Sequence, residues 1–246
     1  MQITMKDIMK NMVLSCLTAF FPLCMYGQYI APVASYTNEK GEEAVMEPGE
    51  AYTGSAPLTA RFTANPSEDD GWTSYYEWRF SMEGADEPYL IRYEQDTEYT
   101  FNQAGVHKIV CYAVFTRGNE RVEYTQDYWE YDSNPISFTI SQSRLEMPNI
   151  FTPNGDNQND TYHAKDNYQS IVEFRAIIFN RWGKKLYEWN DPAGSWDGKY
   201  NGQDMPQGVY YVLVNARGAD GRKFVIKRDV NLIRDYSAES SRVPSN

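Results

Sequence analysis

Short runs of Val, Ile, Tyr, Phe and Trp recur along most of the chain, separated by Gly, Asn, Asp or Pro. The first half contains SYYEWRFSM, PYLIRYEQ, HKIVCYAVFTR, ERVEYTQ and ISFTISQ, and the second contains IVEFRAIIFNRW, KKLYEW, GVYYVLVNARG and RKFVIKRDVNLIR. Runs of this length and composition, bounded by turn residues, are typical of strands. No segment after residue 27 shows a sustained apolar period near 3.6 residues, so the pattern predicts an all-β fold.

Alternation within these runs predicts which side chains are buried. The run around Cys111 is apolar on both faces, which predicts a central strand. In GVYYVLV, Tyr210 and Val212 form one face, whereas Tyr211 and Leu213 form the other. We therefore expect both faces of this strand to be covered.

The first 27 residues resemble a removable export signal, because Lys6 and Lys10 precede the apolar run MVLSCLTAFFPLCM. We expect cleavage near Gly27–Gln28. A lipoprotein signal is the alternative, but VLSC at residues 13–16 matches a lipobox only in part. No later run approaches the roughly 18 apolar residues of a membrane helix, so we expect no transmembrane segment after cleavage.

Charge divides the chain into two unlike halves. Residues 28–146 contain 8 Lys and Arg against 21 Asp and Glu, a net charge of −13, whereas residues 147–246 contain 13 against 12, a net charge of +1. An acidic half repels a phosphate backbone, so nucleic acid is not an expected partner. Cys16 and Cys24 leave with the signal, and Cys111 then stands alone as a buried structural thiol without a disulfide.

The polar segment SQSRLEMP at residues 141–148 interrupts the strand pattern and marks a domain boundary. The sequence thus predicts two tandem β-sandwiches of immunoglobulin-like type. The expected organisation is a signal peptide (1–27), a first sandwich (28–142), a linker (143–147), a second sandwich (148–235) and a polar tail (236–246).

Three stretches of the first half resemble the PKD-type immunoglobulin-like domains. They are GSAPLTARFTAN at residues 54–65, YYEWRF at 75–80 and EYTFNQAGVHKIVCYAV at 98–114. Arg79 and Ser81 stand where that family often has Asp and Gly. Such domains commonly serve as spacers or binding modules on exported proteins, so the resemblance implies a non-enzymatic role.

Four ordered motifs of the second half resemble the gliding motility-associated C-terminal domain, also called the type B sorting domain of the type IX secretion system. They are PNIFTPNGDNQND, IFNRWGKKLYE, WDGKYNGQDMPQGVYYVLV and the closing strand. The residues that carry the resemblance are Phe151, Pro153, Asn154, Gly155, Asp156, Asn159, Asp160, Asn180, Arg181, Trp182, Gly183, Trp196, Asp197, Gly198, Gly208 and Tyr210.

That resemblance implies that the second half is a sorting signal. A protein of this kind is exported through the periplasm, recognised by the outer-membrane machinery of type IX secretion, and delivered to the cell surface, the outer membrane or the medium. Type B domains are associated with outer-membrane proteins of the PorP/SprF-like kind, which implies a partner of that class.

The loop FTPNGDNQND places side-chain oxygens at alternate positions, on Asn154, Asp156, Gln158 and Asp160. Calcium loops share this feature, but one of the EF-hand type has a glycine at its sixth position and a glutamate at its twelfth. Counted from Asn154, these positions are Asn159 and Lys165. No helix follows that would bind a phosphate at its N-terminus. We therefore expect a turn capped by side chains, no high-affinity calcium site and no cofactor.

Trp182 and Trp196 each lie beside a glycine turn. Our first interpretation is that both are buried and brace the hairpins. The alternative is a recognition surface that meets an acidic receptor through four nearby cations, Arg181, Lys184, Lys185 and Lys199.

Catalytic groups are scarce. His107 and His163 fall in different predicted domains, so neither a histidine metal cage nor an obvious Ser-His-Asp set appears. In YTQDYWEYD, Tyr128, Trp129 and Tyr131 are a candidate stacking platform for a surface glycan; the alternative is a strand end with a packed loop.

Three functions remain at this point. The first is a non-enzymatic, adhesin-like surface protein secreted through its C-terminal domain. The second is an accessory subunit of the secretion or gliding machinery, favoured by the short segment of about 120 residues ahead of the sorting motifs. The third is a carbohydrate-active enzyme, which no set of residues in the sequence supports.

Overall fold

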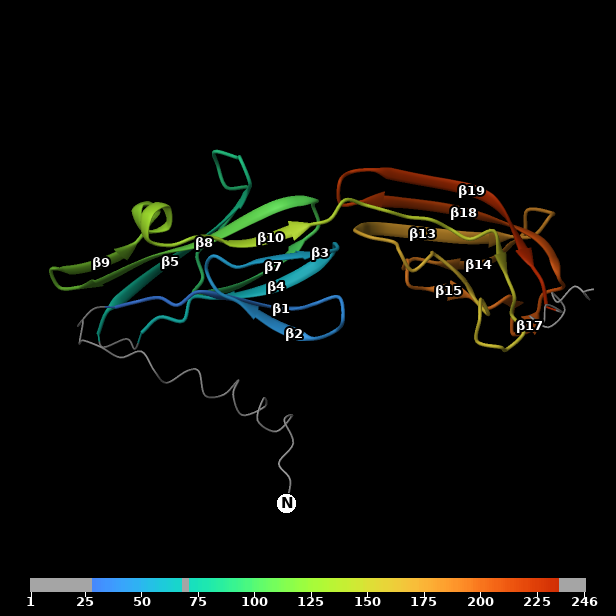
Figure 1. The fold of residues 1–246 in the computed structure, drawn as a ribbon, viewed down its shortest axis with the longest axis horizontal. Coiled ribbons are helices and arrows are strands. Elements are labelled where there is room, and N and C mark those ends of the chain that lie inside the picture. Colours follow the sequence, from blue (N-terminus) through green and yellow to red (C-terminus); the bar gives the residue numbers. More distant parts are fainter. Residues whose placement is uncertain (1–27, 68–70, 235–246) are drawn as a thin grey trace, which may run out of the picture.

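The computed structural model describes residues 28–67 and 71–234 (Figure 1). Apart from one short helical turn, η1 (Tyr128–Asp132), the secondary structure of these residues consists of strands, which confirms the all-β prediction. None of the described helical residues forms a segment long and apolar enough to span a membrane. The predicted signal peptide at 1–27 and the tail at 236–246 lie outside the described residues.

Two facing sheets form the first domain, which we define as residues 28–142. The smaller has the order β2-β1-β4-β7 and comprises β1 (Val33–Thr37), β2 (Glu43–Met46), β4 (Leu58–Thr63) and β7 (Asp96–Phe101). The larger has the order β3-β10-β8-β5-β6, with β9 also paired to β8. Its strands are β3 (Ala51–Gly54), β5 (Thr73–Met82), β6 (Leu90–Arg92), β8 (Gly105–Arg117), β9 (Glu120–Tyr124) and β10 (Ile136–Ile140). Strand β8, which contains Cys111, is central as predicted.

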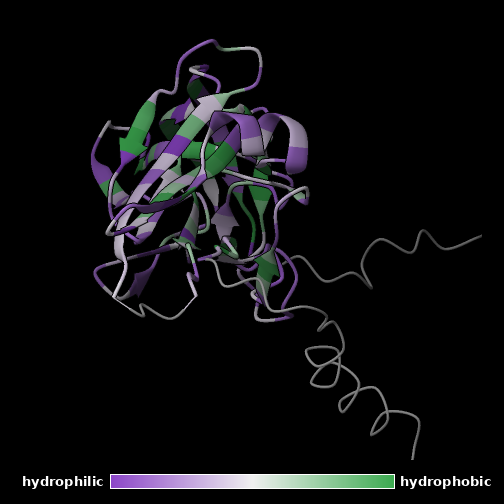
Figure 2. Ribbon diagram, turned by 90° about the vertical axis from the view of Figure 1, so that its left-hand side faces the viewer, coloured by the Kyte–Doolittle hydropathy of each residue, from purple (hydrophilic) through white to green (hydrophobic). Residues whose placement is uncertain are grey.

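Aromatic side chains from both sheets fill the core of the first domain. The ring of Phe62 on β4 lies 5.6 Å from that of Trp78 and 5.2 Å from that of Phe80, both on β5. Phe101 stacks on Phe138 at 4.8 Å. Figure 2 shows the apolar residues within the strands, whereas η1 and the peripheral loops are hydrophilic. This burial gives the domain a core without a disulfide.

The second domain, residues 143–234, is an asymmetric sandwich. Its main sheet has the order β11-β19-β18-β13-β14, and a two-stranded sheet, β12-β15, packs on one side of it. The main strands are β11 (Ile150–Phe151), β13 (Ile171–Phe179), β14 (Lys185–Trp189), β18 (Gly208–Gly218) and β19 (Lys223–Leu232). The short ones are β12 (Tyr162–His163), β15 (Ser195–Trp196), β16 (Lys199–Tyr200) and β17 (Gln203–Asp204), of which the last two form a hairpin.

The expected linker at residues 143–147 is packed against the second domain. Leu145 and Met147 are buried in its core, and Arg144 forms a two-way backbone bridge with Gln169. The segment SQSRLEMP is mostly polar, but its two apolar residues Leu145 and Met147 alternate along the chain and are both buried. The connection between the domains is consequently not a free tether.

The turn between β18 and β19 joins the two domains directly. Ala219 is buried with the core of the first domain, and its carbonyl accepts a hydrogen bond from the Ala104 amide at 3.0 Å. Within the second domain, the Ser143 hydroxyl donates to the Asp220 carboxylate at 2.5 Å and the Ser143 amide donates to it at 3.2 Å, which ties this turn to the first residue of the domain. These bonds hold the pKa of Asp220 below its ordinary value, with the Ser143 hydroxyl as the largest cause. The domains therefore meet through specific contacts at this turn.

Candidate recognition site on the second domain

Three loops lie at the end of the second domain that is far from the first domain (Figure 1). We call them the distal loops, and they cover residues 152–160, 180–184 and 197–207. Strands β13 and β18 run between the junction and this end. The loop 180–184 follows the last residue of β13, and the loop 197–207 precedes the first residue of β18, so both loops lie at this end. The motifs that resemble a sorting domain thus converge in space, although up to about 50 residues separate them in sequence.

The Asx-rich loop is held by its own side chains. The Asp160 carboxylate accepts hydrogen bonds from the amides of Asn154, Gly155 and Asn157 at 2.9, 2.7 and 2.7 Å. The Asp156 carboxylate accepts from the Gln158 amide at 2.8 Å. These N–H donors lower the pKa of Asp160, the Gly155 amide most of all. Three of the four side chains that suggested a calcium ligand set, those of Asn154, Asp156 and Asp160, accept hydrogen bonds from backbone amides, which is the geometry of a capped turn.

Arg234 ties the distal loops together. Its guanidinium donates to the carbonyls of Met205, Gly198 and Pro153 at 3.0, 2.9 and 3.3 Å, and lies 3.4 Å from the Asp204 carboxylate. One cation thereby satisfies acceptors from two separate loops. The sequence patterns do not indicate this residue, since a lone arginine after a strand carries no local signal.

Gly198 allows the loops to approach closely. Its φ is +78°, and a Cβ atom there would lie 3.3 Å from each of the Pro153, Leu232 and Arg234 side chains. A substitution would therefore combine backbone strain with crowding at the Arg234 site.

The remaining motif residues shape turns or fill the core. Asn180 Oδ1 accepts from the amides of Trp182 and Lys184, both at 3.0 Å, and Gly183 has a φ of +79°. Four other members have similar structural places. Asn159 has a positive φ, Asp197 caps the Lys199 amide, Gly208 begins β18 with a positive φ, and the Tyr210 hydroxyl donates to the Pro206 carbonyl.

The two motif tryptophans have opposite environments. Trp196 is fully buried, with its ring 5.3 Å from that of Phe151 and its indole N–H donating to the Lys199 carbonyl. Trp182 is 81% exposed, with the Arg181 guanidinium 5.3 Å from its ring. Our first interpretation is right for Trp196 and wrong for Trp182. Trp182 lies at the hairpin turn itself, where no neighbouring strand covers it.

Of the four cations expected near the exposed indole, Arg181 lies beside it, whereas Lys184 and Lys185 contact other side chains. The Lys184 ammonium lies 4.5 Å from the centroid of the Tyr200 ring, which links two of the distal loops. Lys185 pairs with Glu188 at 2.9 Å. An exposed indole with a guanidinium beside it agrees with one feature of the alternative interpretation, a recognition surface.

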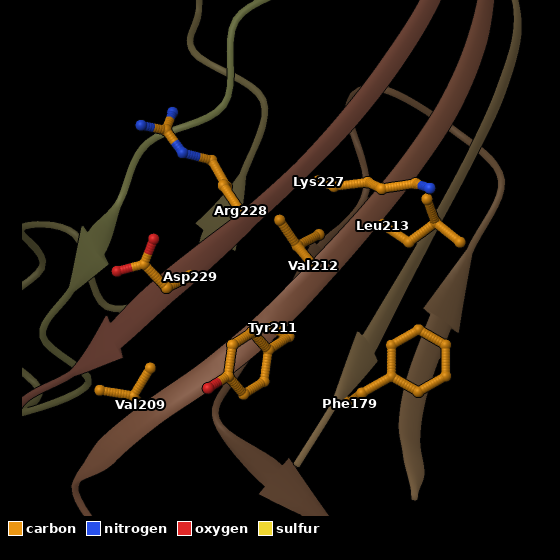
Figure 3. Close-up of a pocket in the computed structure, with 8 residues that line it drawn as sticks. All are labelled: Phe179, Val209, Tyr211, Val212, Leu213, Lys227, Arg228 and Asp229. Atoms are coloured by element: carbon orange, nitrogen blue, oxygen red, sulfur yellow. The ribbon is translucent and has the colours of Figure 1, made fainter. Parts of the chain in front are cut away.

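The main sheet has one uncovered side, which we call the outer face. It lies opposite β12-β15 and includes Phe179, Val209, Tyr211, Leu213, Val225 and Lys227. Phe179, Tyr211 and Leu213 line a shallow hollow of about 620 Å³ that extends toward Lys227 and Asp229 (Figure 3). Our expectation that both faces of β18 are covered is therefore wrong, because the small second sheet packs on only one side.

The candidate glycan platform of the first domain does not form as expected. Trp129 is buried, and its indole N–H donates to the Cys111 carbonyl at 2.9 Å. Tyr128 packs edge-on against Trp129 and Tyr124. Only Tyr131 is freely exposed, so the three rings do not present a common surface.

Cys111 and His107 of the first domain are both buried in its interior. Cys111 is fully buried, as predicted, and burial raises the pKa of its thiol. His107 is buried between the Tyr89 hydroxyl and the Gln103 carbonyl, each 2.8 Å from a ring nitrogen, and burial lowers its pKa. Within residues 28–67 and 71–234, no three His, Cys, Asp or Glu side chains gather as a metal site. The absence of a high-affinity calcium site stays a prediction.

By its geometry, the second domain belongs to the class of small β-sandwiches; its loops are cross-linked at one end, and one face of its main sheet is open. Residues 145–226 match the family model of the CHU_C type IX secretion signal domain. The match covers about a third of the chain, includes the distal loops, and associates this domain with secretion to the cell surface or the medium.

Three of the solved structures that align with the chain do so at low identity and with TM-scores of 0.30 or below. The FN1–FN3 domains of chicken CNTN1 align with 8% identity and a TM-score of 0.30, over 78% of this chain and 69% of that one. A tetra-tandem repeat from the extending region of a large adhesion protein aligns with 11% identity and a TM-score of 0.25, over 84% and 67%. The Bacteroides ovatus protein SGBP-B, in complex with a mixed-linkage heptasaccharide, aligns with 11% identity and a TM-score of 0.24, over 87% and 46%. None of the curated proteins matches the sequence.

Proposed function

We propose that this chain is a non-enzymatic exported protein of the cell surface, in which the second domain is the sorting signal for type IX secretion. The observation that carries the proposal is the family match at residues 145–226, which falls on the domain with the cross-linked distal loops. The first domain is then a PKD-like spacer or binding module. Its buried aromatic core and its buried histidine and cysteine support a structural role for its interior.

A truncation tests the sorting role. The full chain and residues 1–146 are expressed in a host that has the type IX system, and periplasm, outer membrane and medium are separated. We expect the full chain at the surface and the truncated chain in the periplasm. Because Ala219 contributes to the first core, the truncated chain must first be shown to resist protease. Efficient surface delivery of the truncated chain would contradict the proposal.

A second candidate is an accessory subunit of the secretion or gliding machinery that stays bound to a PorP/SprF-like outer-membrane protein. The observation that favours it is the uncovered apolar outer face, since a surface of this kind suits lasting contact with a protein partner. Deletion of the gene distinguishes the two. A subunit is required for the export of other sorting-domain proteins or for surface motility, whereas a passenger is not.

A surface glycan remains a candidate ligand of the first domain, through the exposed Tyr131. A single exposed ring offers limited stacking area, so we expect weak binding. Comparison of the intact protein with Tyr131→Ala on immobilised bacterial glycans tests this role, and equal retention of the two would remove Tyr131 from consideration.

A further inference from the structure

The outer face of the second domain combines exposed and half-buried apolar side chains from adjacent strands. Cross-strand pairing brings Phe179 beside Tyr211 and the buried Ile177 beside Leu213. Val225 follows on β19, where it pairs with Asn215 of β18. Tyr211 and Val225 are 47% and 62% exposed. Contiguous exposed apolar surface is uncommon on a folded domain and marks sites of interaction.

Charged side chains surround this apolar surface, and cations outnumber acids among them. The acids Glu173 and Glu188 are already paired, Glu173 with Arg217 at 2.6 Å and Glu188 with Arg175 at 2.7 Å. Glu188 also accepts from Lys185. This leaves the face with a surplus of positive charge.

Lys223 and Lys227 supply that surplus, which Asp229 on the same face offsets in part. For the part of the chain that the structure describes, no carboxylate lies within salt-bridge distance of Lys223 or Lys227. Lys227 lies beside Leu213 across the β18–β19 pair, at the edge of the hollow (Figure 3). An ammonium group next to an apolar hollow attracts a partner that brings both apolar side chains and carboxylates.

We propose that the outer face is the surface by which this domain docks on a protein component of the secretion machinery, and that the partner presents apolar side chains flanked by carboxylates. This inference rests on the proposed function of the second domain. Tyr211 is the central anchor, since it projects from the middle of the face and aromatic anchors dominate many interfaces. Lys223 and Lys227 orient the partner.

A second copy of this chain is a poorer occupant. Two outer faces in contact would place the lysine surplus of one copy near that of the other, and like charges in close contact oppose association. The partner is therefore a different protein with complementary charge.

Matched substitutions test the proposal in the full chain. Tyr211→Glu and Val225→Glu change the outer face, while Tyr75→Glu and Val45→Glu change first-domain residues that are 50% and 63% exposed. We expect the surface-delivered fraction to fall at least tenfold for the first pair and to stay within twofold of wild type for the second. Lys223→Glu combined with Lys227→Glu should reduce delivery less, and the two Lys→Arg changes should restore it.

Folding is measured on the same variants. Each variant should keep the melting temperature of the wild type within about 4 °C, a shift that corresponds to roughly 1 kcal/mol or less. If Tyr211→Glu melts earlier than that, Tyr211→Ala replaces it, because truncation of an exposed side chain introduces no charge. Tyr211→Ala should still lower delivery.

Three results would overturn the inference. The first is normal delivery of folded Tyr211→Glu and Val225→Glu while residues 1–146 stay in the periplasm; this outcome removes the docking face but leaves the sorting function. The second is a wild-type dimer, detected by light scattering, that Tyr211→Glu dissociates. The third is wild-type binding to anionic phospholipid vesicles that Lys223→Glu with Lys227→Glu abolishes, which would assign the face to lipid. Surface delivery of residues 1–146 would instead contradict the sorting function itself.

Discussion

The two domains differ in the side chains that lie on the outer side of their largest sheet. In the first domain, aromatic and charged side chains alternate there: the Arg79 guanidinium lies 4.2 Å from the centroid of the Tyr112 ring and pairs with Glu77 at 2.5 Å. In the second domain, Phe179, Tyr211 and Leu213 form a continuous apolar surface, and the charges lie around it. The first surface has its polar partners within the chain, whereas the second lacks a partner for its apolar groups.

The two domains also differ in how completely the inner side of the largest sheet is covered. A four-stranded sheet covers the large sheet of the first domain, and the aromatic cluster between them is continuous. The second domain has only β12-β15 and the distal loops on its covered side, and relies on bonds such as those of Arg234 and Asp160 to hold the loops. A domain with less sheet cover thus depends more on polar cross-links.

The largest effect should separate covered from uncovered aromatic residues. Trp196→Ala removes a fully buried indole and should cost about 3–5 kcal/mol of unfolding free energy. Trp182→Ala, its matched control, should change it by about 0.5 kcal/mol or less, because this indole is mostly in water. Urea denaturation followed by circular dichroism measures both. Equal costs for the two substitutions would contradict the contrast.

The next effect concerns the cross-links of the distal loops. Arg234→Ala removes hydrogen bonds to three carbonyls and should cost about 2 kcal/mol, since bonds from charged donors are worth about 1.5–3 kcal/mol each but do not add fully. Arg181→Ala, which removes an exposed cation near Trp182, should cost about 0.5 kcal/mol or less. Faster proteolysis within residues 152–160 should accompany the first change alone. An unaltered cleavage rate would mean that Arg234 is not needed to hold the loops.

A smaller effect should be a loss of stability of the first domain as the pH falls. Burial lowers the pKa of His107 below its ordinary value of 6.5, so the unfolded chain binds a proton at a higher pH than the folded chain does. Stability is fully present above about pH 6.5, falls as the pH drops below that value, and stops falling once the folded pKa is passed. Urea midpoints measured between about pH 7.5 and pH 5 should show this loss. His107→Gln should flatten the pH profile, and an unchanged slope in that variant would assign the dependence to other groups.

The smallest effect is the response to calcium, which we expect to be negligible. Asp160 and Asp156 already accept backbone hydrogen bonds in the Asx-rich loop. A site with a dissociation constant a hundredfold below the free calcium concentration would add about 2.7 kcal/mol of stability. A melting temperature that rises by several degrees in about 1 mM calcium, a stabilisation of that order, and does not rise in Asp156→Ala would show that the loop binds the ion after all.

Sequence patterns identified the strands that carry strong alternation. The runs that predicted β8, β13, β18 and β19 contain β-branched or aromatic residues at most positions, so local composition was sufficient. The strands β1 to β3 have sequences such as VASYT, EAVM and AYTG, with weaker local preference. Their partners across the sheet decide their conformation, and a single sequence does not display those partners.

The candidate site was predictable in its turns and unpredictable in its packing. Asn180, Asp160 and Gly183 act through bonds or dihedrals within a few residues, which the sequence displays. Trp182 and Trp196 have the same local context but opposite burial, because tertiary neighbours decide it. Arg234 acts on carbonyls 29 to 81 residues away, so no local motif reveals it.

The position of Arg234 also imposes an order of assembly. The residue follows all three distal loops along the polypeptide, and the β19 strand before it pairs with β11, the first strand of the domain. Closure of the sheet and locking of the loops must therefore wait until this late segment has emerged and docked. A chain that ends before residue 234 would consequently lack the donor that bonds the Met205, Gly198 and Pro153 carbonyls.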